Sequence, residues 1–342
     1  MIGIRADGND QIGIGHLSRC LSIAQKLRER GVEPCFICSK DSMIDCIQKM
    51  GFTIIISGSK SKEWSLPDEV DSVIRAKVSA LIIDSYYVYE EVFSELHKIT
   101  KIMFIDDLVR FDYDVDVIIN YNIEASKHMY SNTQYTDRSV FTGIEYFPIK
   151  YSLKKKNKDI NKEIRHVLIT TGGTDPFHCT KTILSELLTD NNKEIKFWII
   201  VGVFYAEEYK KELKESYSEY DNVVFLNWGQ NMEKLYCDSD LVIAPGSTTI
   251  YEALSFGVPC ISFQFAENQR DECNALDEMQ LVPFAGDYSM DNKIGMMDRI
   301  FSNEKNFSVR KKRFDRFVHI FDGKGSDRIV NIVLDLDDED KI

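Results

Sequence analysis

Residues 7–16 bring together residue types that can bind an anion and accept a proton. Gly13 and Gly15 stand directly before a predicted helix, and His16 follows them. Free N–H groups and the dipole at a helix start favour a phosphate close to the main chain. Ser18 stands where a dinucleotide fingerprint needs its third glycine, so that motif is excluded. We expect His16 at the helix start as a neutral imidazole, either as a functional residue or as a surface or capping histidine.

Residues 244–254 form a second candidate binding segment. A predicted strand runs through Pro-Gly into Ser247, Thr248 and Thr249 and then into a helix. These hydroxyl residues can cap the helix while their N–H groups bind a phosphate. Glu252 follows one turn later, where its carboxylate can accept both hydroxyls of a ribose. The alternative is simple N-capping, with Glu252 as a partner of the helix dipole.

A third turn, residues 170–176, follows a predicted strand at the start of the second half. Gly172 and Gly173 let the backbone approach a ligand. A tight turn with Thr174 or Asp175 as the helix cap explains the same residues.

Shorter polar groups also follow predicted strands. Asn268 and Gln269 offer amides to sugar hydroxyls, and Tyr86 comes just after an apolar run. The adjacent acids Asp106 and Asp107 end another strand. Paired acids at such a position cap helices more often than they bind metals.

Short apolar runs alternate with amphipathic stretches along the chain, which is the pattern of βα units that wind a parallel sheet. A helix is predicted over residues 15–30, where leucines recur at helical spacing. The predicted strands are residues 2–5, 35–38, 53–56, 80–84, 102–106, 117–120, 166–170, 197–201, 223–226, 241–244 and 260–263. The fold class is therefore α/β.

A basic, polar stretch without an apolar face interrupts this alternation at residues 151–165. It predicts a linker between an N-terminal Rossmann-like domain, residues 1–150, and a C-terminal one, residues 166–325. Residues 326–342 are expected to form a helix that packs back on the N-terminal domain, followed by an acidic tail. Ligands of parallel sheets bind beyond the carboxyl ends of the strands, so we expect the site in a cleft between two facing domains.

The chain has 342 residues and a formal net charge of -13. This acidic balance opposes binding to nucleic acid and to anionic membranes, but it does not exclude one local anion site. No apolar run approaches the ~18 residues of a membrane helix. Arg5 and Asp7 interrupt the segment that a signal peptide would use. We therefore expect a cytoplasmic protein.

Taken together, these motifs resemble the UDP-sugar hydrolases of pseudaminic acid biosynthesis. The matching segments are IGIRADGNDQIGIGHLSRCLSIAQKL, LIIDSYYV, FIDD, IINYNI, TTGGTDP, APGSTTIYEALSFGVPCI, AENQ and DGKGSDRIV. They follow one another from Ile2 to Val330, nearly the whole chain. The resemblance implies a GT-B fold, two Rossmann-like domains facing across a cleft, like that of the glycosyltransferase that adds N-acetylglucosamine in peptidoglycan synthesis.

The resemblance also implies an activity. It is hydrolysis of UDP-2,4-diacetamido-2,4,6-trideoxy-β-L-altropyranose to UDP and the free sugar, by water attack at the anomeric carbon, without a cofactor or metal. The product would serve the glycosylation of flagellin or a surface polysaccharide. His16 matches the proposed base of that family. The family's other functional residues match Ser247, Thr248, Thr249 and Glu252 for UDP, together with Tyr86 and Asn268. Ser85 departs from the pattern, because a histidine is expected there.

The chemistry of these residues agrees with such a reaction. UDP leaves readily once its charge is stabilised, and the helix start at 247–249 can do that without a pair of glycosidase carboxylates. A neutral His16 can then deprotonate a water on the opposite face of the sugar. Two alternatives stay open: a glycosyltransferase in which His16 activates an acceptor hydroxyl, and a nucleotide-sugar-binding regulator that does not need His16. We expect a monomer whose partner is a UDP-sugar.

Overall fold

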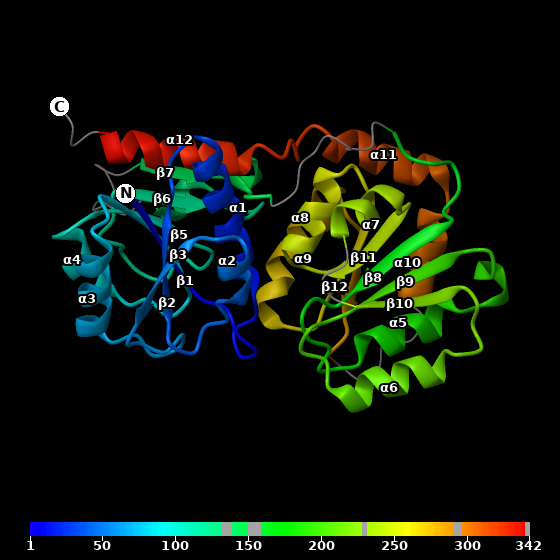
Figure 1. Ribbon diagram of the computed structural model, residues 1–342. Coiled ribbons are helices and arrows are strands. Elements are labelled where there is room, and N and C mark those ends of the chain that lie inside the picture. Colours follow the sequence, from blue (N-terminus) through cyan, green and yellow to red (C-terminus); the bar gives the residue numbers. More distant parts are fainter. Residues whose placement is uncertain (131–138, 150–158, 228–230, 290–295, 339–342) are drawn as a thin grey trace. The chain divides into compact units, whose positions relative to one another are not determined.

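A computed structural model gives the fold of the chain (Figure 1). It describes residues 1–130, 139–149, 159–227, 231–289 and 296–338. The chain divides into two compact units: unit 1 is Met1–Lys150 with Gly323–Ile342, and unit 2 is Tyr151–Asp322. About half of the predicted linker and the last residues of the predicted acidic tail lie outside the described residues.

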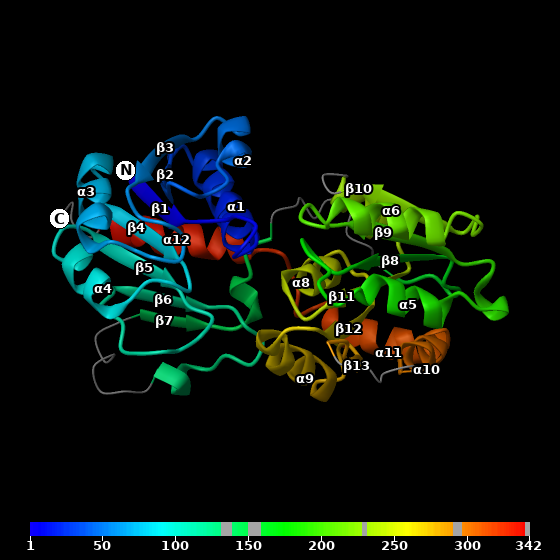
Figure 2. The same cartoon turned by 90° about the horizontal axis from the view of Figure 1, so that it is seen from below.

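Unit 1 is built on a seven-stranded parallel sheet with strand order β3-β2-β1-β4-β5-β6-β7. Its elements are β1 (Ile2–Ala6), α1 (Gly15–Glu29), β2 (Cys35–Ser39), α2 (Asp45–Lys49), β3 (Thr53–Ser57), α3 (Leu66–Ala76), β4 (Ala80–Asp84), α4 (Glu90–His97), β5 (Lys101–Ile105), β6 (Val117–Asn120), β7 (Ser139–Thr142) and α12 (Gly325–Asp338). The central strands β1 and β4 are buried along their whole length. Helices cover both faces of this sheet (Figure 2), so the residues of these strands are mostly apolar.

The last helix, α12, belongs to unit 1 although it is encoded at the end of the chain. It packs against α1 (Figure 1), and its Asp327 pairs with Lys26 of α1 and with Arg30 just after it. Ile329, Val330 and Val333 of α12 are buried. The helix therefore closes the apolar face of the unit beside α1.

Unit 2 repeats the architecture with a six-stranded parallel sheet of order β10-β9-β8-β11-β12-β13. Its elements are β8 (His166–Thr170), α5 (Cys179–Leu187), β9 (Lys196–Val201), α6 (Glu207–Ser216), β10 (Val223–Asn227), α7 (Met232–Asp238), β11 (Leu241–Pro245), α8 (Thr248–Ser255), β12 (Cys260–Gln264), the 3-10 turn η6 (Glu267–Gln269), α9 (Arg270–Glu278), β13 (Phe284–Asp287), α10 (Met296–Glu304) and α11 (Phe307–Phe317). In both units the loops before the helices α1 and α8 leave the carboxyl edge of the sheet.

Every predicted strand is present, and its ends differ from the prediction by at most one residue. The strands β7 and β13 were not predicted from the sequence. β7 is a four-residue strand at the edge of its sheet, and β13 reads FAGD, whose glycine and aspartate disfavour a strand. Pairing with a neighbouring strand outweighs the weak local preference in both.

Candidate active site

The start of α1 has no side-chain cap from any described residue. Its N-cap is Ile14, and its first turn holds no acid. Asn9 shapes the preceding loop, because its N–H donates to the Gly13 carbonyl and its side-chain oxygen accepts the N–H groups of Gln11 and Ile12. Gly13 has a φ of 75°, a left-handed conformation that suits glycine. The N–H groups and the dipole at this helix start favour an anion.

His16 follows Gly15 in the first turn of α1, and only 6% of it is exposed. Its Nδ1 lies 2.7 Å from Oδ1 of Asp84. The ring of Tyr86 meets the imidazole edge-on, with ring centroids 4.4 Å apart. This burial does not fit a surface histidine. With Nδ1 engaged, Nε2 is the ring nitrogen that remains for a reaction.

The partner of His16 comes from the end of β4. Asp84 lies beside Ala6 of β1 and is fully buried. Arg19, one turn along α1, binds both carboxylate oxygens, with Nε 2.5 Å from Oδ2 and Nη2 2.5 Å from Oδ1. Burial alone would raise the pKa of Asp84, but Arg19 and His16 outweigh it and hold this pKa well below its usual range. Asp84 is therefore an ionised partner that can accept hydrogen bonds but not donate them.

A second carboxylate, Asp107, follows β5. Its Oδ2 lies 2.9 Å from Nη2 of Arg19 and accepts the Tyr86 hydroxyl at 2.9 Å. Burial and the nearby Asp107 raise the pKa of the Tyr86 phenol well above its usual value, so Tyr86 is a neutral donor. Nη1 of Arg19 donates to the hydroxyl of Tyr121, just after β6. We call His16, Arg19, Asp84, Tyr86 and Asp107 the His16 cluster.

The adjacent acids after β5 have different partners. Asp106 accepts the N–H groups of Leu108 and Val109 and two tyrosine hydroxyls. It closes a turn but caps no helix, because the described residues 106–116 contain none, so the helix-capping role expected for it is wrong. Asp107 instead joins the His16 cluster, a role that the sequence analysis did not foresee.

Sequence reasoning missed Arg19, Asp84 and Asp107 as members of the site. One signal was available, because Arg19 stands three residues after His16 and thus on the same helix face. Another was an acid ending an apolar strand, since a buried charge needs a partner. Their pairing was not readable, because Arg19 and Asp84 are 65 positions apart in the chain.

The RAD motif belongs to the scaffold beneath this site. Arg5 is fully buried, with Nη1 2.6 Å from Asp7 and Nε 2.7 Å from Glu69. Its guanidinium lies over the ring of Trp64. Asp7 also accepts the N–H of Ser39 at 2.7 Å. These contacts join β1, β2 and α3 and fix the start of the loop that leads to α1.

In unit 2, α8 starts immediately after Ser247, and no side chain of the described residues caps it. Ser247 occupies the N-cap position, but its hydroxyl donates back to the Pro245 carbonyl at 3.1 Å. The interpretation of Ser247 as a simple capping side chain is therefore wrong. The helix start, with Thr248 and Thr249 in its first turn, retains the N–H groups and dipole that favour an anion.

Glu252 lies one turn into α8 and is partly buried. Its Oε2 accepts the hydroxyl of Tyr236 at 2.8 Å. Tyr236 is itself buried on α7 and stacks on Phe256, with ring centroids 5.6 Å apart. This contact orients the carboxylate that the sequence analysis assigned to a ribose.

The turn after β8 packs tightly against the loop after β9. Gly172 has a φ of 84°, and a Cβ on Gly202 would lie 2.4 Å from the Gly173 carbonyl oxygen. Asp175 accepts the N–H groups of the first two residues of α5, at 2.7 and 3.0 Å. The capping role considered for Asp175 is present, and the two glycines serve at least the packing of the turn.

The ENQ segment lies beside the turn that precedes α8. A Cβ on Gly246 would lie 2.7 Å from the carbonyl oxygen of Gln269. The Gln269 side-chain oxygen accepts the N–H groups of Phe265 and Ala266, so it holds its own turn together. Asn268 is exposed. Of the two predicted amides, Asn268 is the one turned outward.

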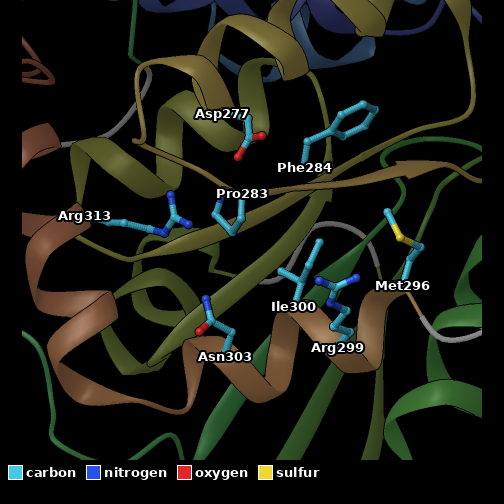
Figure 3. Close-up of a pocket in the computed structure, with 8 residues that line it drawn as sticks. All are labelled: Asp277, Pro283, Phe284, Met296, Arg299, Ile300, Asn303 and Arg313. Atoms are coloured by element: carbon cyan, nitrogen blue, oxygen red, sulfur yellow. The ribbon is translucent and has the colours of Figure 1, made fainter.

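An open pocket lies elsewhere on unit 2, between β13 and the helices α9, α10 and α11 (Figure 3). Its lining is Asp277, Pro283, Phe284, Met296, Arg299, Ile300, Asn303 and Arg313. None of the predicted site residues is among these.

None of the helices in the described ranges combines the length and apolarity that a membrane span requires.

Comparisons with known proteins identify relatives with similar sequences. Residues 166–277 match the glycosyltransferase family 28 C-terminal domain. Over 308 residues the chain is 27% identical to an uncharacterised protein of Methanocaldococcus jannaschii, a match that covers 85% of this chain and 62% of that protein. The chain thus spans less than two-thirds of this relative's length.

Two further relatives carry functional names. The chain is 23% identical to the spore coat polysaccharide biosynthesis protein SpsG of Bacillus subtilis, with 98% of each chain covered. It is 25% identical to the UDP-2,4-diacetamido-2,4,6-trideoxy-beta-L-altropyranose hydrolase of Campylobacter jejuni, with 78% of this chain and 92% of that protein covered. The resemblance found in the sequence is thus a distant relationship to that hydrolase.

Solved structures of the same fold cover nearly the whole chain. MurG of Acinetobacter baumannii superposes with a TM-score of 0.67 at 14% identity, covering 98% of this chain and 99% of that one. MnaA of S. aureus, in a structure with UDP, gives 0.67 at 13% identity, covering 98% and 97%. The predicted GT-B fold of two Rossmann-like domains is confirmed.

Proposed function

We propose that this protein hydrolyses a UDP-sugar to UDP and the free sugar. One observation carries the proposal: His16 is buried at a helix start, and its Nδ1 lies 2.7 Å from an ionised carboxylate. Such a partner orients the imidazole and stabilises the imidazolium that forms when Nε2 takes a proton. His16 is thus suited to act as a general base at its Nε2.

In the proposed reaction, Nε2 of His16 accepts a proton from a water as the water oxygen bonds to the anomeric carbon. The bond between that carbon and the terminal phosphate oxygen of UDP breaks, and UDP leaves with the bonding electron pair. Tyr86 keeps the imidazole in place through its edge-on contact. The backbone at Gly13 and Gly15 binds polar groups of the substrate through the start of α1.

UDP binding is assigned to unit 2. The diphosphate is held at the start of α8, by 247–249, and the ribose hydroxyls by Glu252. The backbone at Gly172 and Gly173 and the exposed amide of Asn268 complete the polar contacts, while Gln269 holds the turn that carries Asn268. The match of residues 166–277 to the glycosyltransferase family 28 C-terminal domain supports this assignment, since the range contains all these residues. A solved structure of the same fold, that of MnaA, was determined with UDP, which supports UDP as the ligand.

For the sugar, we propose a 2,4-diacetamido-2,4,6-trideoxyhexose, on the strength of the named Campylobacter jejuni relative. The reaction then yields a free diacetamido sugar for pseudaminic acid biosynthesis. The helix starts take over the charge stabilisation that a metal would supply, so neither a metal nor a cofactor is required.

The test is to incubate the purified protein with candidate UDP-sugars in ¹⁸O-labelled water without any acceptor. We expect release of UDP and the label at the anomeric carbon of the free sugar. Label on the phosphate would mean attack at phosphorus and would contradict the proposal. Absence of UDP release from every UDP-sugar tried would also contradict it.

A second candidate is a glycosyltransferase, which the family 28 match favours. His16 would then deprotonate an acceptor hydroxyl instead of water. This candidate predicts that UDP release depends on an added acceptor and that solvent ¹⁸O stays out of the product.

A further inference from the structure

The two nitrogens of an imidazole act differently, and only an unprotonated Nε2 can serve His16 as a base. In the neutral ring one nitrogen carries the hydrogen, and the groups around it decide which. Two groups approach Nδ1 of His16: Oδ1 of Asp84 at 2.7 Å and Nη2 of Arg19 at 2.9 Å. They favour opposite tautomers, because the carboxylate accepts a hydrogen while the guanidinium donates one.

The hydrogens of Arg19 decide between them. Nη2 carries two hydrogens. Three groups surround Nη2: Oδ1 of Asp84 at 2.5 Å, Nδ1 of His16 at 2.9 Å, and Oδ2 of Asp107, which forms an ion pair with it at 2.9 Å. Nε donates to Oδ2 of Asp84, and Nη1 donates to Tyr121. Charged carboxylate oxygens bind guanidinium hydrogens more strongly than a neutral ring nitrogen does, so the two carboxylates compete with Nδ1 of His16 for the hydrogens of Nη2.

We propose that Asp84, Arg19 and Asp107 are positioning residues that fix the tautomer of His16, with the hydrogen on Nδ1 and the lone pair on Nε2. Asp84 accepts the Nδ1 hydrogen. Asp107 occupies the second Nη2 hydrogen of Arg19, which would otherwise turn to Nδ1 and move the imidazole hydrogen to Nε2. This inference rests on the proposed function, because it explains how the base of that reaction is kept ready.

The charges of the cluster agree with this role. Arg19 contributes one positive charge and the two carboxylates contribute two negative charges, all with side chains at most 9% exposed. A net negative charge therefore faces His16 when it becomes an imidazolium, which stabilises the proton on Nε2. Tyr86 adds no charge, since its hydroxyl donates to the same Asp107 oxygen that binds Arg19.

The test is NMR of the protein labelled with ¹⁵N-histidine, at a pH where the imidazole is neutral. The chain has six histidines, and the signals that disappear in His16→Asn identify His16. We expect a protonated Nδ1 and an unprotonated Nε2 in the wild type. A wild-type His16 with its hydrogen on Nε2 would overturn the inference without any further variant.

Asp84→Asn tests the carboxylate. An amide has one acceptor oxygen and donates through its nitrogen, so it cannot accept from His16 and from both nitrogens of Arg19. We expect the hydrogen of His16 to move to Nε2 and kcat to fall. An amide in place of the acid of a serine-protease triad lowers kcat by about 10⁴ through this tautomer change. UDP affinity, a property of unit 2, should not change. An unchanged tautomer in this variant would contradict the inference.

Asp107→Ala tests the role of Asp107 in holding Nη2 of Arg19. It also provides a test of the inference if Asp84→Asn fails to fold. Removing Asp107 frees an Nη2 hydrogen, so we expect part of the His16 population to shift to Nε2–H. The matched control is Asp114→Asn, because Asp114 lies 2.8 Å from Nδ1 of His97 at the opposite edge of the same sheet. This control should leave kcat and the His16 signals unchanged.

The outcomes also separate this inference from the proposed function. If no UDP-sugar is hydrolysed but the tautomer responds as expected, the reaction assignment is wrong and the positioning network stands. If hydrolysis occurs and neither Asp84→Asn nor Asp107→Ala alters the tautomer, the network inference is wrong and the function stands.

Discussion

At the scale of single residues, His16→Asn removes the nitrogen that takes the proton in the proposed reaction. General-base catalysis contributes about 10²–10⁴-fold, so we expect kcat to fall by that factor and some turnover to remain. UDP affinity should be unchanged, because the residues assigned to UDP belong to unit 2. Steady-state kinetics and calorimetric UDP titration measure both. His97→Asn is the control, and equal losses in the two variants would remove His16 from the mechanism.

Glu252 is expected to affect binding before it affects turnover. Glu252→Ala removes a charged acceptor, and hydrogen bonds to charged groups are worth about 1.5–3 kcal/mol, so UDP affinity should fall roughly ten-fold or more. Tyr236→Phe removes the hydroxyl that orients this carboxylate at 2.8 Å and should give a smaller loss. UDP titration checks the order of the two effects. Unchanged affinity in Glu252→Ala would refute the ribose assignment.

The residues of the site differ in how far a single sequence reveals them. His16 and 247–249 were predictable, because each stands at the start of a helix that follows an apolar strand. Arg19 and Asp84 were not predictable as a pair, since only the sheet brings the end of β4 beside β1. Ser247 was placed correctly at an N-cap. The direction of its hydroxyl was not predictable, because it depends on where the folded backbone puts the Pro245 carbonyl.

At the scale of elements, α12 depends on a glycine at its first residue. A Cβ on Gly325 would lie 1.9 Å from the carbonyl oxygen of Phe147, a backbone atom that cannot simply rotate away. Overpacking costs about 1–3 kcal/mol, so Gly325→Ala should lower the thermal midpoint of unfolding measured by scanning calorimetry. Asn331→Ala, on the exposed face of the same helix, should change it little. Equal midpoints for Gly325→Ala and the wild type would show that α12 adapts.

The helix α10 ends on a buried acid whose ionisation opposes folding. Oε2 of Glu304 has no hydrogen-bond partner among the described residues. Burial raises the pKa of Glu304 and outweighs the attraction of Arg313 and Arg310. A folded-state pKa above the unfolded value of about 4.3 means that stability is fully present below that pH and falls as pH rises through the folded pKa.

Glu304→Gln tests this sign. The glutamine side chain is neutral at every pH, so the variant should be more stable than the wild type at pH 7. The difference in stability should shrink as the pH falls toward the pKa of the carboxyl in the unfolded chain. Chemical unfolding of both proteins over this pH range gives the difference. A variant that is less stable at neutral pH, with the gap closing in acid, would mean that the charge of Glu304 stabilises unit 2.

At the scale of the whole molecule, the net charge of -13 opposes some ligands but not a local anion site. It opposes polyanions and anionic lipid surfaces, yet each unit contains a helix, α1 or α8, whose start has no side-chain cap among the described residues. Fixed N–H dipoles at a helix start act locally and do not need a positive net charge. The α/β alternation along the chain predicted the fold from sequence, because each apolar run forms one strand, buried in the middle of the sheets and only partly buried at the edge strands β3 and β10.

This division of charge leads to a prediction about metals. If the helix starts alone stabilise the diphosphate of the leaving UDP, EDTA should leave both UDP affinity and turnover unchanged. Asp106 and Asp107 are the acids a metal would be expected to use, but Asp106 accepts two backbone N–H groups and Asp107 binds Arg19 and Tyr86. Turnover with and without EDTA, and after Mg²⁺ is added back, provides the measurement. A loss that Mg²⁺ restores would mean that the helix dipoles do not suffice and that an ion completes the phosphate site.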